Sequence, residues 1–266
     1  MEATTIGMNR TGIAVSPIDS KAMTEAADAL SPAVPIDTAA ADAERLAYIN
    51  ESDAVGSIPP PASMKGVLKA GMAKMKGGAP SVLMDKIGER IAFERGGTRL
   101  YDALITKFQA VDALGEEVLP SASSLKGADG QKVGSVSSEM PLQTLMRIRN
   151  EELQHFKMLG QAMEKLGGDP TAQTPCADVI ATANMGIMQV VTDPRTTFAQ
   201  SLNAILSAEL TDNAGWELLV QLAEDAGETE LAGQFLGALG QEQEHLAIVK
   251  GWLTTLVSKG AGTPAV

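Results

Sequence analysis

The chain has 266 residues, of which 20% are charged and 3% are aromatic, and its formal net charge is −12. This negative charge argues against nucleic acid as a partner, because binding to a phosphate backbone requires a basic surface. The length is sufficient for one full hydrophobic core and a shorter additional segment.

Cysteine usage and hydropathy indicate a protein of a reducing compartment. Cys176 is the only cysteine, which excludes an intramolecular disulfide and a thiolate metal site. No apolar run approaches the ~20 residues of a transmembrane helix. Residues 1–20 also lack the apolar stretch of a secretory signal. We therefore expect a cytoplasmic protein without a transmembrane segment.

Residues 1–80 are predicted to form a partly extended N-terminal arm. The first 62 residues are rich in Ala, Asp, Pro and Ser, and only 39–49 carries a helical pattern. Over 64–77, methionine, valine and leucine alternate with lysine in a short basic amphipathic pattern. This pattern predicts a helix that either packs against the chain's own core or docks on a membrane surface or a partner.

Four long helices are predicted after this arm. Apolar residues recur at helical spacing over 81–114, 139–166, 193–225 and from about 230 to 259. Gly167 and Gly168 should end the second helix. Asp193 followed by Pro194 resembles an N-cap with proline in the first turn, and predicts the start of the third. Between these two helices, the apolar stretch 177–191 predicts a short helix or an apolar crossover.

Both histidines of the chain follow a glutamate by three residues within these helical patterns. The pairs are Glu152 with His155 and Glu242 with His245. Positions i and i+3 of a helix project from one face, so each pair can direct a carboxylate oxygen and an imidazole nitrogen at one ion.

The other two long helices each contribute one glutamate, Glu94 and Glu209, in the middle of an apolar stripe. A carboxylate on a core-facing stripe is costly unless it is paired, and two divalent ions would supply the pairing. The four helical patterns together therefore predict a site for two metal ions.

On these residues the chain resembles the ferritin-like di-metal carboxylate superfamily, which includes bacterioferritins, rubrerythrins and manganese catalases. The resemblance covers residues 81–258. It implies an all-α fold in which residues 81–260 form a ferritin-like four-helix bundle with one long crossover connection, preceded by the extended N-terminal arm 1–80. It also implies two iron ions, or alternatively two manganese ions or a mixed pair, held by Glu94, Glu152, His155, Glu209, Glu242 and His245.

The resemblance further implies that Glu152 and Glu242 bridge the two ions. Glu94 and His155 would complete the ligands of one ion, and Glu209 and His245 those of the other. Mixed oxygen and nitrogen ligands suit iron or manganese better than zinc or copper.

The reaction that the resemblance implies is one with hydrogen peroxide or dioxygen. We expect a non-haem di-metal oxidoreductase of the peroxidase or oxidase type, similar to rubrerythrins, with an external electron donor and a homo-oligomeric assembly. The chain lacks the Cys-x-x-Cys pair of a rubredoxin-like domain. Because ligands alone do not choose the reaction, manganese catalase, iron sequestration or storage without turnover, and a structural protein with a vestigial site are the alternatives.

Two residues near the ligands are candidate catalytic groups. Tyr101 follows Glu94 by seven residues, as a tyrosine does in ferritins and rubrerythrins, where it can bond a ligand or donate an electron; an ordinary core role is the alternative. Asp212 follows Glu209 by three residues. It could be a seventh ligand, a partner that orients a histidine, or a proton shuttle.

Four further residues near the ligands attract attention for other reasons. Glu151 and Glu244 are expected on a solvated helix face. Gly96 and Gly97 interrupt the first long helix just after Glu94, at a cost of about 1 kcal/mol each relative to alanine. Close packing, a local bulge or an open pocket beside the metals would each explain them.

Overall fold

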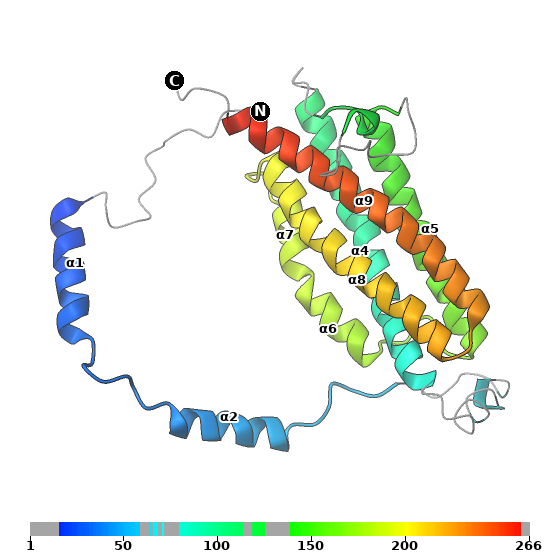
Figure 1. The fold of residues 1–266 in the computed structure, drawn as a ribbon, viewed down its shortest axis with the longest axis horizontal. Helices are drawn as coiled ribbons and strands as arrows, with labels where there is room; N and C mark the ends of the chain where they lie inside the picture. The colour runs from blue at the N-terminus through cyan, green and yellow to red at the C-terminus, as the bar shows by residue number, and fades with distance from the viewer. Residues whose placement is uncertain are drawn as a thin grey trace. The chain divides into compact units, whose positions relative to one another are not determined.

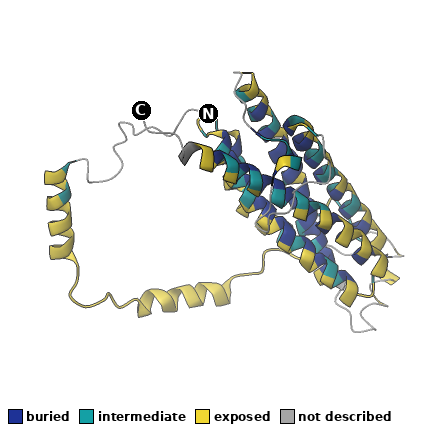
Figure 2. Cartoon of the chain, turned by 45° about the horizontal axis from the view of Figure 1, so that its top comes forward, coloured by how far each residue is buried: buried dark blue, intermediate teal, exposed yellow. Residues whose placement is uncertain are grey.

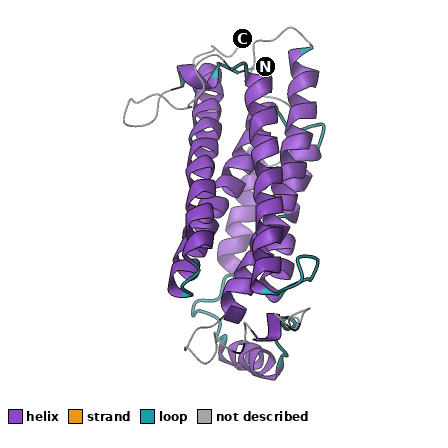
Figure 3. Cartoon of the chain, turned by 90° about the vertical axis from the view of Figure 1, so that its right-hand side faces the viewer, coloured by secondary structure: helices purple, strands orange, loops and turns teal. Residues whose placement is uncertain are grey.

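The computed structural model describes residues 16–58, 64, 66–68, 71, 80–113, 119–125 and 139–261. All regular structure within these ranges is helical, which confirms the predicted all-α class (Figure 3). The chain divides into two units, whose main parts are Glu2–Ala54 and Val55–Thr263. Among the helices of the described ranges, none combines the length and the apolar character that crossing a membrane requires.

The first unit contains the helices α1 (Pro17–Leu30) and α2 (Ala39–Glu51), and neither helix has a buried residue. The helix predicted over 39–49 corresponds to α2. The prediction missed α1, which begins with Ser16 at the N-cap, Pro17 in the first turn and a hydrogen bond of 2.7 Å from the Ser16 hydroxyl to Asp19. The helix predicted over 64–77 lies largely outside the described residues.

The second unit is built on four long helices: α4 (Pro80–Asp112), α5 (Pro141–Leu166), α8 (Phe198–Asp225) and α9 (Thr229–Ala261). Helix α4 packs on α5, α6 and α8, while α9 packs on α8 and α5 (Figure 1). The shorter α6 (Pro175–Ala183) and α7 (Met185–Thr192) occupy the connection from α5 to α8, where the sequence predicted one short helix or an apolar crossover over 177–191. A 3₁₀ turn, η2 (Ala122–Ser124), follows α4.

The ends of the helices follow local chemistry, with one correction to the prediction. Helix α5 ends at Gly167, whose φ of 89° suits glycine and matches the predicted stop. Helix α8 does not begin at Asp193. Its N-cap is Thr197, whose hydroxyl accepts a hydrogen bond from the Gln200 amide, whereas Asp193 accepts from the amide and side chain of Arg195 in the preceding turn.

The buried residues form two apolar clusters with a polar layer between them. Figure 2 shows the buried residues, in dark blue, along the long helices, whereas α1 and α2 carry none. One cluster contains Leu104, Leu145, Leu202 and Trp252, and the other contains Ile87, Leu159, Trp216 and Phe235. On every long helix the residues between the two clusters are polar and buried: Glu94, Glu152, His155, Glu209, Asp212, Glu242 and His245. The core thus isolates a compact set of ionisable groups from solvent.

Candidate metal centre

Seven ionisable side chains from four helices meet in the polar layer, and each is at most 3% exposed. Five of them are carboxylates and two are imidazoles. All eight of the residues that the sequence singled out as ligands or catalytic groups are buried, and Tyr101 of α4 is the eighth. Concentrating unpaired carboxylates in a core is strongly unfavourable, so the layer calls for compensating positive charge.

The potential ligand atoms fall into two groups with the same composition. Glu94, His155 and Glu242 form one group, and Glu152, Glu209 and His245 form the other, with the ligand atoms of each group within 4.8 Å of one another. Each group offers two carboxylates and one imidazole. A further group joins Asp212 to Glu94, Glu152 and Glu242 within the same limit, so Asp212 lies among the same carboxylates.

Glu242 lies between the two histidines. Its Oε1 is 2.7 Å from Nδ1 of His155, and its Oε2 is 3.1 Å from Nδ1 of His245. The two rings are 6.3 Å apart between centroids. One carboxylate therefore presents a different oxygen to each of the two ligand groups.

Three of the carboxylates share another arrangement, in which one oxygen is held by a donor from a facing helix. Trp216 Nε1 donates to Oε1 of Glu94 at 3.0 Å, the Tyr101 hydroxyl donates to Oε1 of Glu209, and Arg90 donates to Oδ1 of Asp212. The second oxygen of each carboxylate is buried without a hydrogen-bond partner among the described residues. Tyr101 therefore contacts the candidate ligand Glu209 of α8, and not Glu94 of its own helix.

The outer nitrogens of the two histidines are also held. Nε2 of His155 is 2.8 Å from Oε1 of Gln241, and Nε2 of His245 is 2.8 Å from Oε2 of Glu151. These bonds fix both rings with Nδ1 directed toward the carboxylates.

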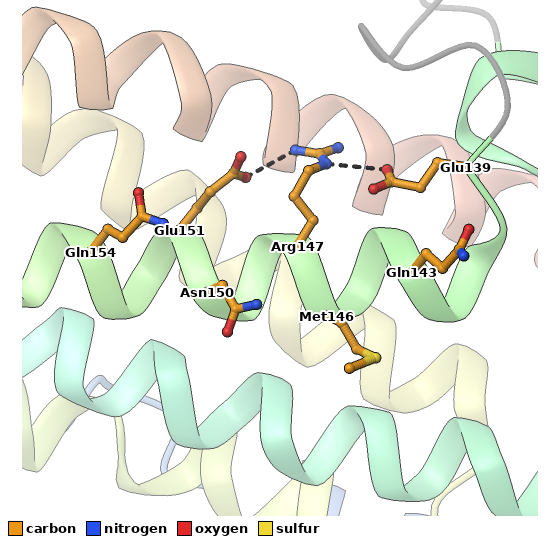
Figure 4. Close-up of a pocket in the computed structure, with 7 residues that line it drawn as sticks. All are labelled: Glu139, Gln143, Met146, Arg147, Asn150, Glu151 and Gln154. Atoms are coloured by element: carbon orange, nitrogen blue, oxygen red, sulfur yellow. Dashed lines mark hydrogen bonds and ion pairs between the residues drawn. The ribbon is translucent and has the colours of Figure 1, made fainter.

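Glu151 and Glu244 are only partly exposed, whereas a solvated helix face was expected for them. Both are bonded to Arg147, at 2.9 and 3.0 Å, and Glu139 is bonded to the same guanidinium at 3.1 Å. Figure 4 shows Arg147 of α5 between Glu151 of the same helix and Glu139, which precedes the helix, and these residues line a surface pocket. Helical angle alone misassigned Glu151, because its side chain reaches across to α9.

Arg90 is a functional candidate that the sequence analysis missed. It is 1% exposed, donates to both the side chain and the backbone carbonyl of Asp212, and stacks 3.9 Å above the Phe93 ring centre. A Cβ atom on Gly215 would overlap its guanidinium. The sequence signal that could have identified Arg90 is its position four residues before Glu94, in an otherwise apolar stripe. Asp212 was a candidate for orienting a histidine, but the side chain that is hydrogen-bonded to it is Arg90.

Without metal, burial and mutual repulsion shift the proton affinities of this layer. Burial, followed by the charge of Glu242, raises the pKa of Glu209 to about 8. Burial and the charges of Glu242 and Glu94 raise the pKa of Glu152 well above its usual value. Burial lowers the pKa of His155, but contacts with Glu242 and Glu94 outweigh it and raise that pKa to about 11. The metal-free layer therefore retains protons that a bound cation would displace.

These residues fit a pair of divalent cations. The unpartnered oxygens of Glu94, Glu209 and Asp212 are buried within the ligand groups, and bonds of about 2.0–2.2 Å to nitrogen and oxygen ligands match such spacings. Five carboxylates, the Arg90 guanidinium and two divalent cations would together be nearly neutral if both histidines were uncharged. The described buried carboxylate and histidine clusters could thus hold metal.

Comparisons of the chain with protein-family models, with curated proteins and with solved structures found no match.

Proposed function

We propose that this chain is a ferritin-like di-metal carboxylate protein that binds two iron or manganese ions and reacts with hydrogen peroxide or dioxygen as a peroxidase or oxidase. The observation that carries the proposal is the pair of ligand groups of matching composition, each with two carboxylates and one imidazole and all buried between two apolar clusters.

The order of the core clusters along the helices supports the ferritin-like interpretation. Chain direction takes α4 and α9 from the cluster of Ile87 and Phe235 to the cluster of Leu104 and Trp252, and takes α5 and α8 the opposite way. Helices α5 and α8 therefore run in the same direction, which requires a connection along the length of the bundle. Residues 167–197, including α6 and α7, supply it, as the long crossover does in ferritin-like folds.

In this proposal Glu94, His155 and Glu242 hold one ion, and Glu152, Glu209 and His245 hold the other. Glu242 would contact both ions, since its two oxygens face different histidines. Glu152 would be the second carboxylate placed to contact both ions, as the resemblance implies, and it lies within 4.8 Å of Glu94 and Glu242 of the other group. When bound, the two metal ions supply the electrons that reduce the O–O bond.

The chain's own residues have three tasks around that chemistry. Trp216, Tyr101 and Arg90 each fix one oxygen of a carboxylate and so orient the other. Tyr101 holds a proton at Oε1 of Glu209, and Asp212 offers the unpartnered Oδ2 as a second proton-carrying group. The two apolar clusters exclude water, which strengthens every electrostatic interaction in the layer.

Metal analysis joined to rapid kinetics tests the proposal. Protein reconstituted without oxygen in ferrous iron or manganese should contain close to two ions per chain, and stopped-flow mixing with peroxide and with dioxygen should change its spectrum with turnover. Glu152→Ala should lose most of the metal, whereas Glu164→Ala, an exposed position on the same helix, should lose none. A wild-type chain that remains metal-free ends the proposal. Two bound ions without turnover would favour sequestration, and peroxide disproportionation by the manganese form would favour a manganese catalase.

A further inference from the structure

The two histidines have matching hydrogen bonds to partners of different charge. Nε2 of His155 lies 2.8 Å from the side-chain oxygen of Gln241, and Nε2 of His245 lies 2.8 Å from a carboxylate oxygen of Glu151. Each partner directly precedes a bridging glutamate in the sequence, since Gln241 precedes Glu242 and Glu151 precedes Glu152. The arrangement is therefore repeated in position, but one partner is a neutral amide and the other an acid.

The arginine beside Glu151 is shared with two other carboxylates. Arg147 donates to Glu151, but the same guanidinium also serves Glu139 and Glu244. One positive charge is thus divided among three carboxylates. Glu151 also borders a surface pocket of about 460 Å³ (Figure 4), so solvent reaches this end of the hydrogen-bond chain, while His245 itself is fully buried.

A carboxylate that accepts the outer N–H of a metal-bound imidazole makes the inner nitrogen a stronger donor. A charge-assisted hydrogen bond of this kind is roughly twice as strong as a neutral one. The amide of Gln241 orients the His155 ring but does not supply a comparable negative charge. The Nδ1 atom of His245 should therefore be a stronger electron-pair donor to a metal ion than that of His155.

Other contacts do not offset this difference. Glu94 and Glu209 each accept one hydrogen bond from a neutral donor, Trp216 and Tyr101 respectively. Asp212 lies within 4.8 Å of carboxylates from both groups, Glu94 and Glu242 of one and Glu152 of the other, and its charge is paired with that of Arg90 at a buried contact. Among these contacts, the difference in charge between the two ligand groups lies at the partner of the histidine, a neutral amide for His155 and a carboxylate for His245.

We propose that Glu151 makes the two metal positions unequal, so that the ion held by His245 binds more tightly and fills first, while the ion held by His155 binds second. This inference rests on the proposed two-metal function. Glu151 acts here as a positioning residue, through His245, and touches neither metal.

Titration with Mn²⁺ under exclusion of oxygen tests the inference without reference to activity. The six-line electron paramagnetic resonance signal of free Mn²⁺ is lost on binding, so it reports both stoichiometry and Kd. Wild-type protein should bind two ions in two resolved steps whose Kd values differ by about 10- to 100-fold, the usual scale of an altered ligand partner. In Glu151→Gln, the tighter step should weaken by this factor and merge with the other, with two ions still bound.

Two variants give the matched comparisons. Gln241→Glu places a carboxylate on the other histidine and should tighten the weaker step. Glu139→Gln removes a charge from the same Arg147 cluster but from a residue that bonds the arginine rather than a histidine, and should leave both steps unchanged. His245→Ala should abolish the tighter step and His155→Ala the weaker one, which assigns each step to its group.

The outcomes separate this inference from the proposed function. Failure of the wild type to bind Mn²⁺ would overturn both. Two ions bound with equal affinity, or a Glu151→Gln titration identical to wild type, would overturn the inequality while leaving the two-metal site intact. An effect of Glu139→Gln as large as that of Glu151→Gln would also overturn it. The change in metal affinity would then come from the loss of a negative charge near Arg147, and not from the hydrogen bond to His245.

Discussion

Gly97 of α4 lies directly against the carboxylate of Glu152 on α5. A Cβ atom at position 97 would overlap Oε2 of Glu152, whereas a Cβ atom on neighbouring Gly96 would have no heavy atom within 4 Å. Position 97 is also three residues after Glu94, where the other long helices place His155, Asp212 and His245. Helix α4 instead has a glycine at this position, because the carboxylate of Glu152 from α5 occupies the space that a side chain would need.

The first prediction compares the two adjacent glycines. Gly97→Ala should displace Glu152 and weaken metal binding by about 10- to 100-fold. Gly96→Ala should keep both ions and gain up to about 1 kcal/mol of stability, since alanine favours a helix interior. Metal content and thermal melting of the two variants are the measurements. Equal metal content in both variants would show that Glu152 can adjust, and that the close approach has no role in binding.

Much of this arrangement follows from periodicity alone. An apolar stripe at helical spacing that contains Glu94, Glu209 and two Glu-x-x-His pairs requires these side chains to face a common core, and the structure brings them together. Local signals such as Gly167 after α5 located helix ends equally well. These features depend on residues close in sequence, which is why a single chain suffices to predict them.

What the sequence did not reveal depends on contacts between helices. Glu151 was misassigned because its partner His245 lies on α9, and Arg90 was missed because its partner Asp212 lies on α8. Helix α1 and the start of α8 were missed or misplaced because Pro17 and Pro194 allow either a helix start or a turn. Where a helix begins depends on capping hydrogen bonds and on contacts with neighbouring segments, and the spacing of residues in the sequence does not determine either.

The second prediction links metal to stability and pH. The folded-state pKa of Glu209 is raised from 4.5 to about 8, so the folded metal-free protein retains a proton that the unfolded chain loses. Metal-free stability should then fall as pH rises from about 5 to 8. The raised pKa of His155 acts in the same direction above pH 6.5. Bound cations replace these protons, so the difference in Tm between metal-loaded and metal-free protein should widen over this range. A difference that is constant with pH would contradict buried ligation.

The third prediction concerns the buried pair of Arg90 and Asp212. Each single variant, Arg90→Met or Asp212→Asn, leaves one charge buried without its partner, which typically costs about 3–5 kcal/mol. The double variant removes both charges, and its stability should exceed that of either single variant. Urea unfolding of the metal-free proteins provides the four free energies of the cycle. If the double variant loses the sum of the unfolding free energies lost by the two single variants, the two side chains do not depend on one another.

The last prediction separates proton handling from metal binding at Tyr101. Its hydroxyl donates to Glu209, and it is 1% exposed. Tyr101→Phe keeps the packing and removes only that donor, so the variant should hold nearly two ions per chain while its reaction with peroxide or dioxygen slows by about 10²-fold. The chain's other tyrosine, Tyr48, is 60% exposed on α2, and Tyr48→Phe should change neither quantity. His155→Ala removes a proposed ligand and should lower metal content and rate together. If Tyr101→Phe loses metal to the same extent as His155→Ala, the hydroxyl serves to hold Glu209 in place for binding and carries no separate role in the reaction.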